Sequence, residues 1–115
     1  MDDKKVVALL GQVLQKTRSG KLRWEPTAKE DEFFAIHGDF TITICRMPLH
    51  PTSEVRVEEL ALVLREQDQE LLHITPSTTE GVTSAALEEL DQLARRQAFG
   101  VDTKLDKLLG ELARL

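Results

Sequence analysis

The sequence predicts an α+β fold: an N-terminal helix, a four-stranded antiparallel meander, and two C-terminal helices packed on one face of the sheet. Three patterns support this prediction. Apolar and polar residues alternate within the run from Phe33 to Arg46, apolar residues recur at helical spacing on both sides of the central region, and the strands follow one another without intervening helices. The 115 residues are enough for a single domain, residues 1–115, that buries its own core.

The first helix is predicted from Asp2 or Asp3 to about Thr17, because its apolar residues recur every three or four positions. These residues are Val6, Leu9, Leu10, Val13 and Leu14. Gly20 marks the end of this helix. The segment Lys21 to Thr27 is predicted to be extended, since Pro26 disfavours helical geometry in the residue before it, and Trp24 is expected to wedge against the core.

The first hairpin joins Phe33–Ile36 to the strand that begins at Phe40, with Gly38 in the turn. Two registers are possible, because a slip of one residue exchanges the two faces of a strand. A two-residue loop places Phe33 and Ala35 on the face of Ile42, whereas a three-residue loop places Phe34 and Ile36 there. The second register buries more apolar side chain, so we expect the three-residue loop.

A second hairpin follows a loop from Met47 to Glu54, which contains two prolines. Its strands are predicted between Val57 and Gln67 and from Leu71 to Thr75. After these strands, residues 76–81 form a predicted loop. The order of these segments completes the four strands of the meander.

The first of the two C-terminal helices is predicted to begin near Thr83 or Ser84, whose hydroxyl can act as an N-cap, and to stop at Gly100. Glu88, Glu89 and Asp91 are predicted to form its solvated face. Asp102 is the expected N-cap of the last helix. That helix carries leucines at helical spacing, namely Leu105, Leu108, Leu109, Leu112 and Leu115.

Composition and charge exclude several classes of function. Fifteen Lys and Arg against twenty Asp and Glu give a formal net charge of −5, which disfavours binding to nucleic acid or to an anionic membrane. The apolar run Val6 to Leu10 is too short for a signal peptide or a membrane span. The lone Cys45 cannot form an internal disulfide, which fits a reducing compartment. We therefore predict a cytoplasmic protein without a membrane partner.

No catalytic or metal-binding motif is present, and we predict no catalytic residue, no metal and no cofactor. His37, His50 and His73 lack the spacing of metal ligands. Cys45 lies inside a predicted strand with only Arg46 as a neighbouring cation, and we interpret it as a structural residue. An alternative is a small enzyme or ligand-binding protein that uses His37, Asp39 and Cys45 of one hairpin.

The leading hypothesis for function is a small acidic protein-interaction module, a homodimer or the partner of another protein. Two surfaces could serve this purpose: the sheet face opposite the helices, or the leucine-rich last helix. The predicted interaction face comprises Thr41, Thr43, Cys45, Ala61, Val63 and Leu71. A further alternative is nucleic-acid binding through the basic segment Lys16–Trp24, although the acids that follow Trp24 cancel part of its positive field.

Two segments resemble small uncharacterised bacterial proteins for which we know no activity. The first, GKLRWEPTAKEDEF at Gly20–Phe33, has their GKLxWxxT pattern, and the second, LARRQAFGVDTKLDKLL at Leu93–Leu109, has their LARRxAxGVD helix break. The resemblance spans most of the chain but does not extend to Met47–Glu58. It implies a bacterial, intracellular setting and the order of elements given above, and it transfers no site residue.

Overall fold

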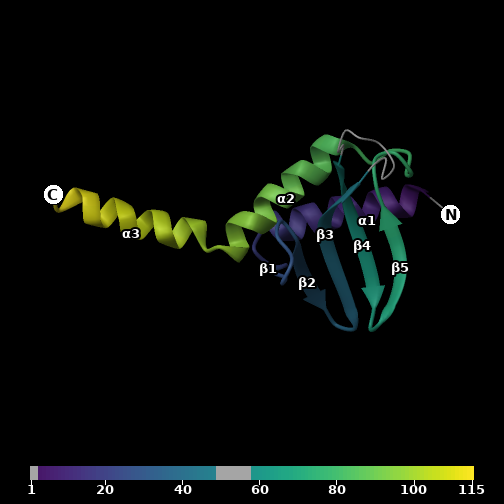
Figure 1. Cartoon of the computed structure of the whole chain (residues 1–115), viewed down its shortest axis with the longest axis horizontal. Helices are drawn as coiled ribbons and strands as arrows, with labels where there is room; N and C mark the ends of the chain where they lie inside the picture. The colour runs from purple at the N-terminus through teal and green to yellow at the C-terminus, as the bar shows by residue number, and fades with distance from the viewer. Residues whose placement is uncertain (1–2, 49–57) are drawn as a thin grey trace.

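The computed structural model describes residues 3–48 and 58–115, and it confirms the α+β class (Figure 1). A single helix, α1 (Asp3–Arg18), precedes the strands, and α2 (Ser84–Ala98) and α3 (Val101–Ala113) follow them. The strands form one antiparallel sheet whose spatial order equals their sequence order. They are β1 (Glu25–Pro26), β2 (Phe33–His37), β3 (Phe40–Pro48), β4 (Glu58–Glu66) and β5 (Gln69–Ile74). The two-residue β1 is an addition to the four strands that the sequence predicts.

The core lies between one face of the sheet and the helices α1 and α2. Apolar residues of α1 at helical spacing, such as Val6, Leu10 and Val13, pack in the same buried cluster as Leu87 and Leu90 of α2. The strands contribute residues from alternate positions, as a half-buried sheet requires. That strand set is Phe33, Ala35, Ile42, Ile44, Leu60, Leu62 and Ile74.

The register of the first hairpin differs from the one that we expected. Phe33 pairs with Ile44 and His37 with Phe40, so Gly38 and Asp39 form a two-residue loop. Gly38 has φ of +59° at the first loop position, where a tight hairpin turn of this kind favours glycine. Phe33 is therefore buried, whereas Ile36 lies on the other face and is exposed.

Contacts with α2 and its C-terminal end explain why burying Phe33 is favourable. The ring of Phe33 meets Phe99 edge to face at 5.7 Å between centroids, and the guanidinium of Arg95 lies 5.1 Å above it. Edge-to-face rings and a cation over a ring are both attractive arrangements. A comparison of the two registers by strand hydrophobicity alone cannot include these partners, because they come from a distant part of the sequence.

The second hairpin is confirmed, with small changes at its ends. β3 continues through Met47 to Pro48, beyond the predicted start of the following loop. The rest of that loop, including His50, lies outside the described residues. The turn between β4 and β5 has no glycine, and Gln67 takes the positive φ of 54° in its place. A register shift beside Leu64 and Arg65 leaves Leu71 without a paired residue in β4.

The helix boundaries at α2 and α3 follow from capping. Thr83 accepts a hydrogen bond from the backbone N–H of Ala86 at 3.1 Å, which confirms it as the N-cap of α2. Gly100 adopts the left-handed conformation and is itself the N-cap of α3, with no side-chain cap. Asp102 is therefore not the N-cap that we predicted. It lies in the first turn of α3, where it accepts a hydrogen bond from Arg96 at 2.6 Å.

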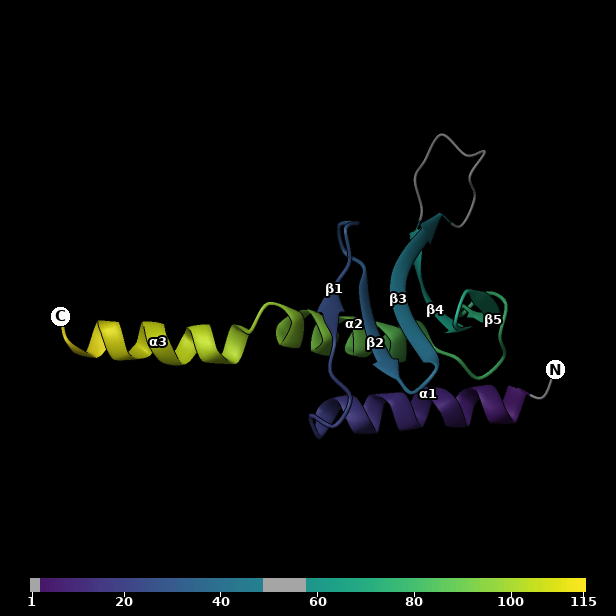
Figure 2. The same ribbon diagram turned by 90° about the horizontal axis from the view of Figure 1, so that it is seen from below.

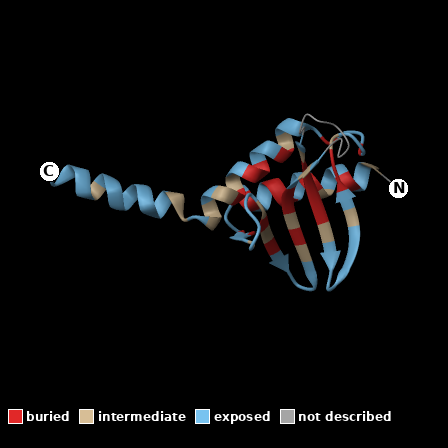
Figure 3. Cartoon of the chain, in the orientation of Figure 1, coloured by how far each residue is buried: buried red, intermediate tan, exposed pale blue. Residues whose placement is uncertain are grey.

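The two C-terminal helices differ in their relation to the sheet. α2 packs across the strands, whereas α3 extends away from the rest of the chain after its first turn (Figure 1). None of the residues of α3 is buried, and Figure 3 shows the helix exposed along most of its length. The radius of gyration is 16.1 Å, against about 13 Å for a compact chain of this length. Among the described residues, no helix has the length and hydrophobicity needed to span a membrane.

Candidate functional site

Five of the six residues of the predicted interaction face, all except Leu71, lie on the sheet side that faces away from α1 and α2. Pairing sets Thr43 opposite Val63 and Cys45 opposite Ala61, so these four share one face, and Thr41 lies on it two residues before Thr43. Cys45, Ala61 and Val63 form a small buried cluster together with Met47. Among the six predicted residues only Leu71 is exposed, while Thr41 and Thr43 are half-buried. The apolar part of this face therefore offers a partner little surface.

The hairpin residues of the enzymatic alternative do not converge. His37 and Asp39 are exposed at the turn, whereas Cys45 is buried on the opposite face of the sheet, five residues along β3 from the turn. At about 3.3 Å per residue this places Cys45 roughly 16 Å along the strand from Phe40. Burial raises the pKa of the Cys45 thiol, and the nearby Glu32 carboxylate raises it further. Such a thiol is a poor nucleophile.

Metal binding finds no support in the described part of the chain. No group of three or more His, Cys, Asp or Glu side chains in residues 3–48 and 58–115 is arranged to hold a metal ion. His73 lies 4.0 Å from Glu70 at the sheet edge, away from the hairpin turn that holds His37. These histidines therefore do not form a shared site.

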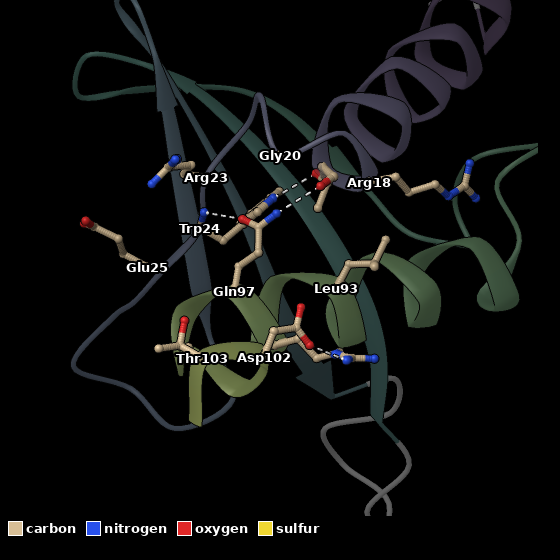
Figure 4. Close-up of a pocket in the computed structure, with 12 residues that line it drawn as sticks. Arg18, Gly20, Arg23, Trp24, Glu25, Leu93, Gln97, Asp102 and Thr103 are labelled. Carbon is tan, nitrogen blue, oxygen red and sulfur yellow. Dashed lines mark hydrogen bonds and ion pairs between the residues drawn. The ribbon is translucent and has the colours of Figure 1, made fainter. Parts of the chain in front are cut away.

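A polar pocket of about 680 Å³ lies where α1, the segment before β1, and the junction of α2 with α3 meet (Figure 4). Trp24 forms part of its floor, and its indole N–H donates to Thr17 Oγ at 2.9 Å. The Gln97 side chain accepts from the Trp24 backbone N–H at 3.1 Å and donates to the Thr17 carbonyl at 2.9 Å. These bonds join α1 to α2 and satisfy the polar groups of the floor.

The arginines around this pocket do not form an anion site. Figure 4 shows the side chains of Arg18 and Arg23 pointing away from each other. Arg18 pairs with Glu89, and Arg96 pairs with Asp102. Trp24 is only 2% exposed, so its ring is not available to stack on a base. The basic segment Lys16–Trp24 thus supplies a structural tryptophan rather than an aromatic platform for nucleic acid.

Asp91 is a buried carboxylate that the sequence analysis placed on the solvated face of α2. It is 4% exposed, because its position four residues after Leu87 puts it on the apolar stripe of the helix. Its Oδ2 lies 3.6 Å from Arg46 and 3.8 Å from Arg95. Burial raises the pKa of Asp91, and the two arginines partly offset that rise. The helical spacing of Leu87, Asp91 and Ala94 is the sequence feature that could have predicted the burial of Asp91.

Arg95 extends this polar cluster to the segment before β2. Its guanidinium donates to Asp31 at 2.8 Å while also lying over the ring of Phe33. Arg95 and its neighbour Arg96 both bond to aspartates. Asp31 lies in a loop, and Asp102 lies in α3. The cluster joins α2 to the sheet and to the loop before β2. An open pocket of about 400 Å³ lies beside it, and Asp31, Phe33 and Arg95 are among its lining residues.

The leucines of α3 that follow its first turn are all exposed, and so is Leu115 just beyond the end of the helix. Their exposed fractions run from 46% to 99%, and Phe99 at the end of α2 adds a further exposed ring. The leucines recur at steps of three and four, so they form one stripe along the helix. We call this set the leucine stripe; it consists of Leu105, Leu108, Leu109, Leu112 and Leu115.

An apolar groove of about 490 Å³ lies between α1 and the turn of the first hairpin. In Figure 2 the hairpin end of β2 and β3 projects toward α1, and Figure 1 shows that this end extends past the helix. The floor is apolar, and Lys16, Lys21 and His37 stand among its lining residues. The apolar lining residues are Leu9, Val13, Leu22, Phe40, Ile42 and Leu64. We call this feature the hairpin groove.

A comparison with protein-family models found no match, and searches among curated proteins and among solved structures likewise found no similar chain. The resemblance of Gly20–Phe33 and Leu93–Leu109 to small bacterial proteins therefore stays a prediction. An inference about function therefore depends on the leucine stripe, the hairpin groove and the other surfaces described above.

Proposed function

We propose that this chain is a protein-interaction module that self-associates through the leucine stripe of α3. The observation that supports this function is the exposure of four leucines on one helix that buries none of its residues, with Leu115 exposed just beyond its end. An amphipathic helix in a folded protein normally covers its apolar face against another surface. Exposed apolar patches of this kind mark protein interfaces more often than they mark inert surface.

The stripe is a better candidate than the predicted sheet face. Ala61 and Val63 are already buried within the chain, so a partner that covered them would remove little further apolar surface from water. The leucines of α3, in contrast, would lose most of their exposed area on association. Of the two surfaces that the sequence suggested, the last helix is therefore the one that we propose.

The other two hypotheses have less support. An enzyme would need His37 and Cys45 near each other, and they lie on opposite faces of the sheet. Nucleic-acid binding would need Trp24 at the surface. We also propose a cytoplasmic location, because the lone Cys45 fits a reducing compartment.

Light scattering over a concentration series tests the proposed function. The unmodified chain should approach twice the monomer mass of 13.0 kDa as its concentration rises. The double variant Leu108→Glu, Leu112→Glu should stay at the monomer mass, since two carboxylates in the stripe oppose its burial. Lys107→Glu, on the far side of α3, is the control and should associate like the parent. A monomer at every concentration would contradict the proposal.

A further inference from the structure

We infer that the hairpin groove is the receptor for α3 of a second copy, so that two chains exchange their last helices reciprocally. This inference rests on the proposed function, which states only that α3 associates. It adds the surface that receives α3. Four observations support this choice: the layer that the groove leaves open, its length, its charges, and the size of interface that a stable dimer needs.

The first observation concerns the layer of helices over the core face of the sheet. α1 and α2 cover part of this face. Among the described residues, no helix crosses the sheet at the end that holds the hairpin turn (Figure 1). Phe40 is 37% exposed there although it lies on the same face as the buried Ile42. Figure 3 shows the strands changing from buried to exposed toward this end. The hairpin end therefore leaves room for one more helix beside α1.

The second observation is a match of length between the groove and the part of the stripe that lies in α3. On the α1 side, the lining residues run from Leu9 to Lys16. Leu105 to Leu112 of α3 spans the same number of residues. At 1.5 Å per residue both segments are about 10 Å long. A helix laid along α1 would bring the central leucines of the stripe over the apolar floor.

The third observation is charge complementarity at the edge of the groove. Lys16 and Lys21 are exposed among its lining residues, and neither forms an ion pair within the described part of the chain. Asp106 of α3 is exposed and, three residues before Leu109, adjoins that leucine at one border of the stripe. With the stripe on the groove floor, its carboxylate can face the two ammonium groups. Such a pair orients a docking helix more than it strengthens binding.

The fourth observation concerns the size of the interface. A stable interface uses roughly 20 to 30 residues from each partner. α3 has 13 residues, so pairing of one α3 with another would supply too few. In a reciprocal exchange, each copy provides both its α3 and its hairpin groove, and this combination comes near the required number. Exchange about a two-fold axis also closes the assembly at two copies.

Gly100 supplies the junction that such an exchange requires. It has φ of +60° and separates α2 from α3 without a side chain that would fix their angle. Because α3 points away from its own sheet, its stripe is free to meet another molecule before it could meet its own groove (Figure 1). A short linker at a helix junction is a common site for exchange between identical chains.

The first test compares two exposed apolar residues on one hairpin. Phe40→Glu alters the groove, and Ile36→Glu alters the opposite face of the same hairpin, where Ile36 is 63% exposed. We expect Phe40→Glu to shift the dimer to monomer by at least tenfold in dissociation constant, and Ile36→Glu to leave it unchanged. Circular dichroism checks that both variants are folded. A dimer that survives Phe40→Glu but not Leu108→Glu, Leu112→Glu would overturn the groove while leaving the proposed function intact.

Crosslinking between different molecules provides a second readout that does not depend on a destabilising substitution. In a Cys45→Ala background, a Lys16→Cys protein is mixed with an Asp106→Cys protein and treated with a short bismaleimide. A covalent heterodimer is expected, and Lys107→Cys, on the far side of α3, should not replace Asp106→Cys. Covalent pairs of Asp106→Cys with itself, in place of the heterodimer, would show α3 pairing with α3 and would refute the exchange.

Discussion

α2 and α3 are consecutive helices of similar length and similar apolar spacing, yet one is buried along a face and the other is exposed throughout. α2 places Leu87, Leu90 and Ala94 in the core, whereas the leucine stripe of α3 stays in water. Both sequences have an apolar face of the kind that drives a helix onto a surface. The difference shows that helical spacing of apolar residues predicts a face that is stabilised by burial. Whether another part of the same chain buries that face depends on the rest of the fold.

The contacts at their ends strengthen this contrast. α2 begins at a side-chain cap on Thr83 and is held to the sheet by Arg95, which reaches both Asp31 and Phe33. α3 begins at Gly100 without a side-chain cap, and its ion pair with α2 is an exposed one between Arg96 and Asp102. Exposed pairs contribute little to stability. The position of α2 is therefore fixed by several independent contacts, and that of α3 by few.

The largest expected difference is in the free energy of unfolding. Leu90→Ala removes a fully buried side chain and should cost about 2 to 5 kcal/mol, because the core cannot fill the cavity. Leu109→Ala, on α3, should change the stability of the monomer by less than about 0.5 kcal/mol. Urea denaturation at low protein concentration, followed by circular dichroism, measures both. Equal losses of unfolding free energy in the two variants would mean that Leu109 is buried within the monomer, which would contradict the difference between α2 and α3.

Thiol reactivity offers the next largest contrast. A Leu109→Cys variant carries one exposed thiol on α3 and the buried Cys45 in β3. Since burial raises the pKa of the Cys45 thiol, its thiolate is scarce as well as inaccessible. We expect the introduced thiol on α3 to react at least roughly tenfold faster than Cys45 with a chromogenic disulfide reagent. Equal rates in the folded protein would contradict the burial of Cys45, and equal rates in denaturant are the control.

Substitutions at the helix starts should have smaller effects. Thr83→Ala removes the N-cap of α2 and should cost about 1 kcal/mol. Asp102→Ala in the first turn of α3 removes only an exposed ion pair and should cost less than about 0.5 kcal/mol. Thermal or urea denaturation of the two variants under one buffer condition gives both values. A larger loss at Asp102 would show that α3 stabilises the folded monomer.

The smallest expected effect is a pH dependence at Asp91 in α2. Its pKa in the folded state is raised by burial, so the folded state holds the proton more firmly than the unfolded state does. The stability that Asp91 contributes is therefore greatest below the unfolded-state pKa of about 3.9 and is lost as pH rises through the folded-state pKa. Asp91→Asn cannot titrate, and it should gain stability relative to the parent over this interval. A constant difference across pH would exclude the raised pKa.

Local patterns were sufficient for most of the fold. The helical spacing of Val6, Leu10 and Val13, the alternation around Ile42, and the stop at Gly100 predicted elements that the structure contains. Residue spacing reports on a helix or strand because each has a fixed period. Trp24 was also correctly expected against the core, although its bonds to Thr17 and Gln97 could not be foreseen.

Predictions that depended on distant partners were less successful. The hairpin register was wrong because Phe33 is stabilised by Phe99 and Arg95, some sixty residues later in the chain. We predicted that Asp91 is solvated because it is a charged residue. Its helical position between Leu87 and Ala94 indicates the buried face instead. The strand pairing places Thr41, Thr43, Cys45, Ala61 and Val63 on one side of the sheet. The burial of Ala61 and Val63 depends on packing that no single strand encodes.

The sequence by itself determined that this chain has two amphipathic C-terminal helices separated by Gly100, because spacing and turn chemistry act over a few residues. Only the tertiary structure decided that the apolar face of α2 meets the sheet while the face of α3 meets water. That outcome depends on the area of the sheet and on the direction in which the chain leaves Gly100. Burial is a property of two surfaces, and a sequence pattern describes only one of them.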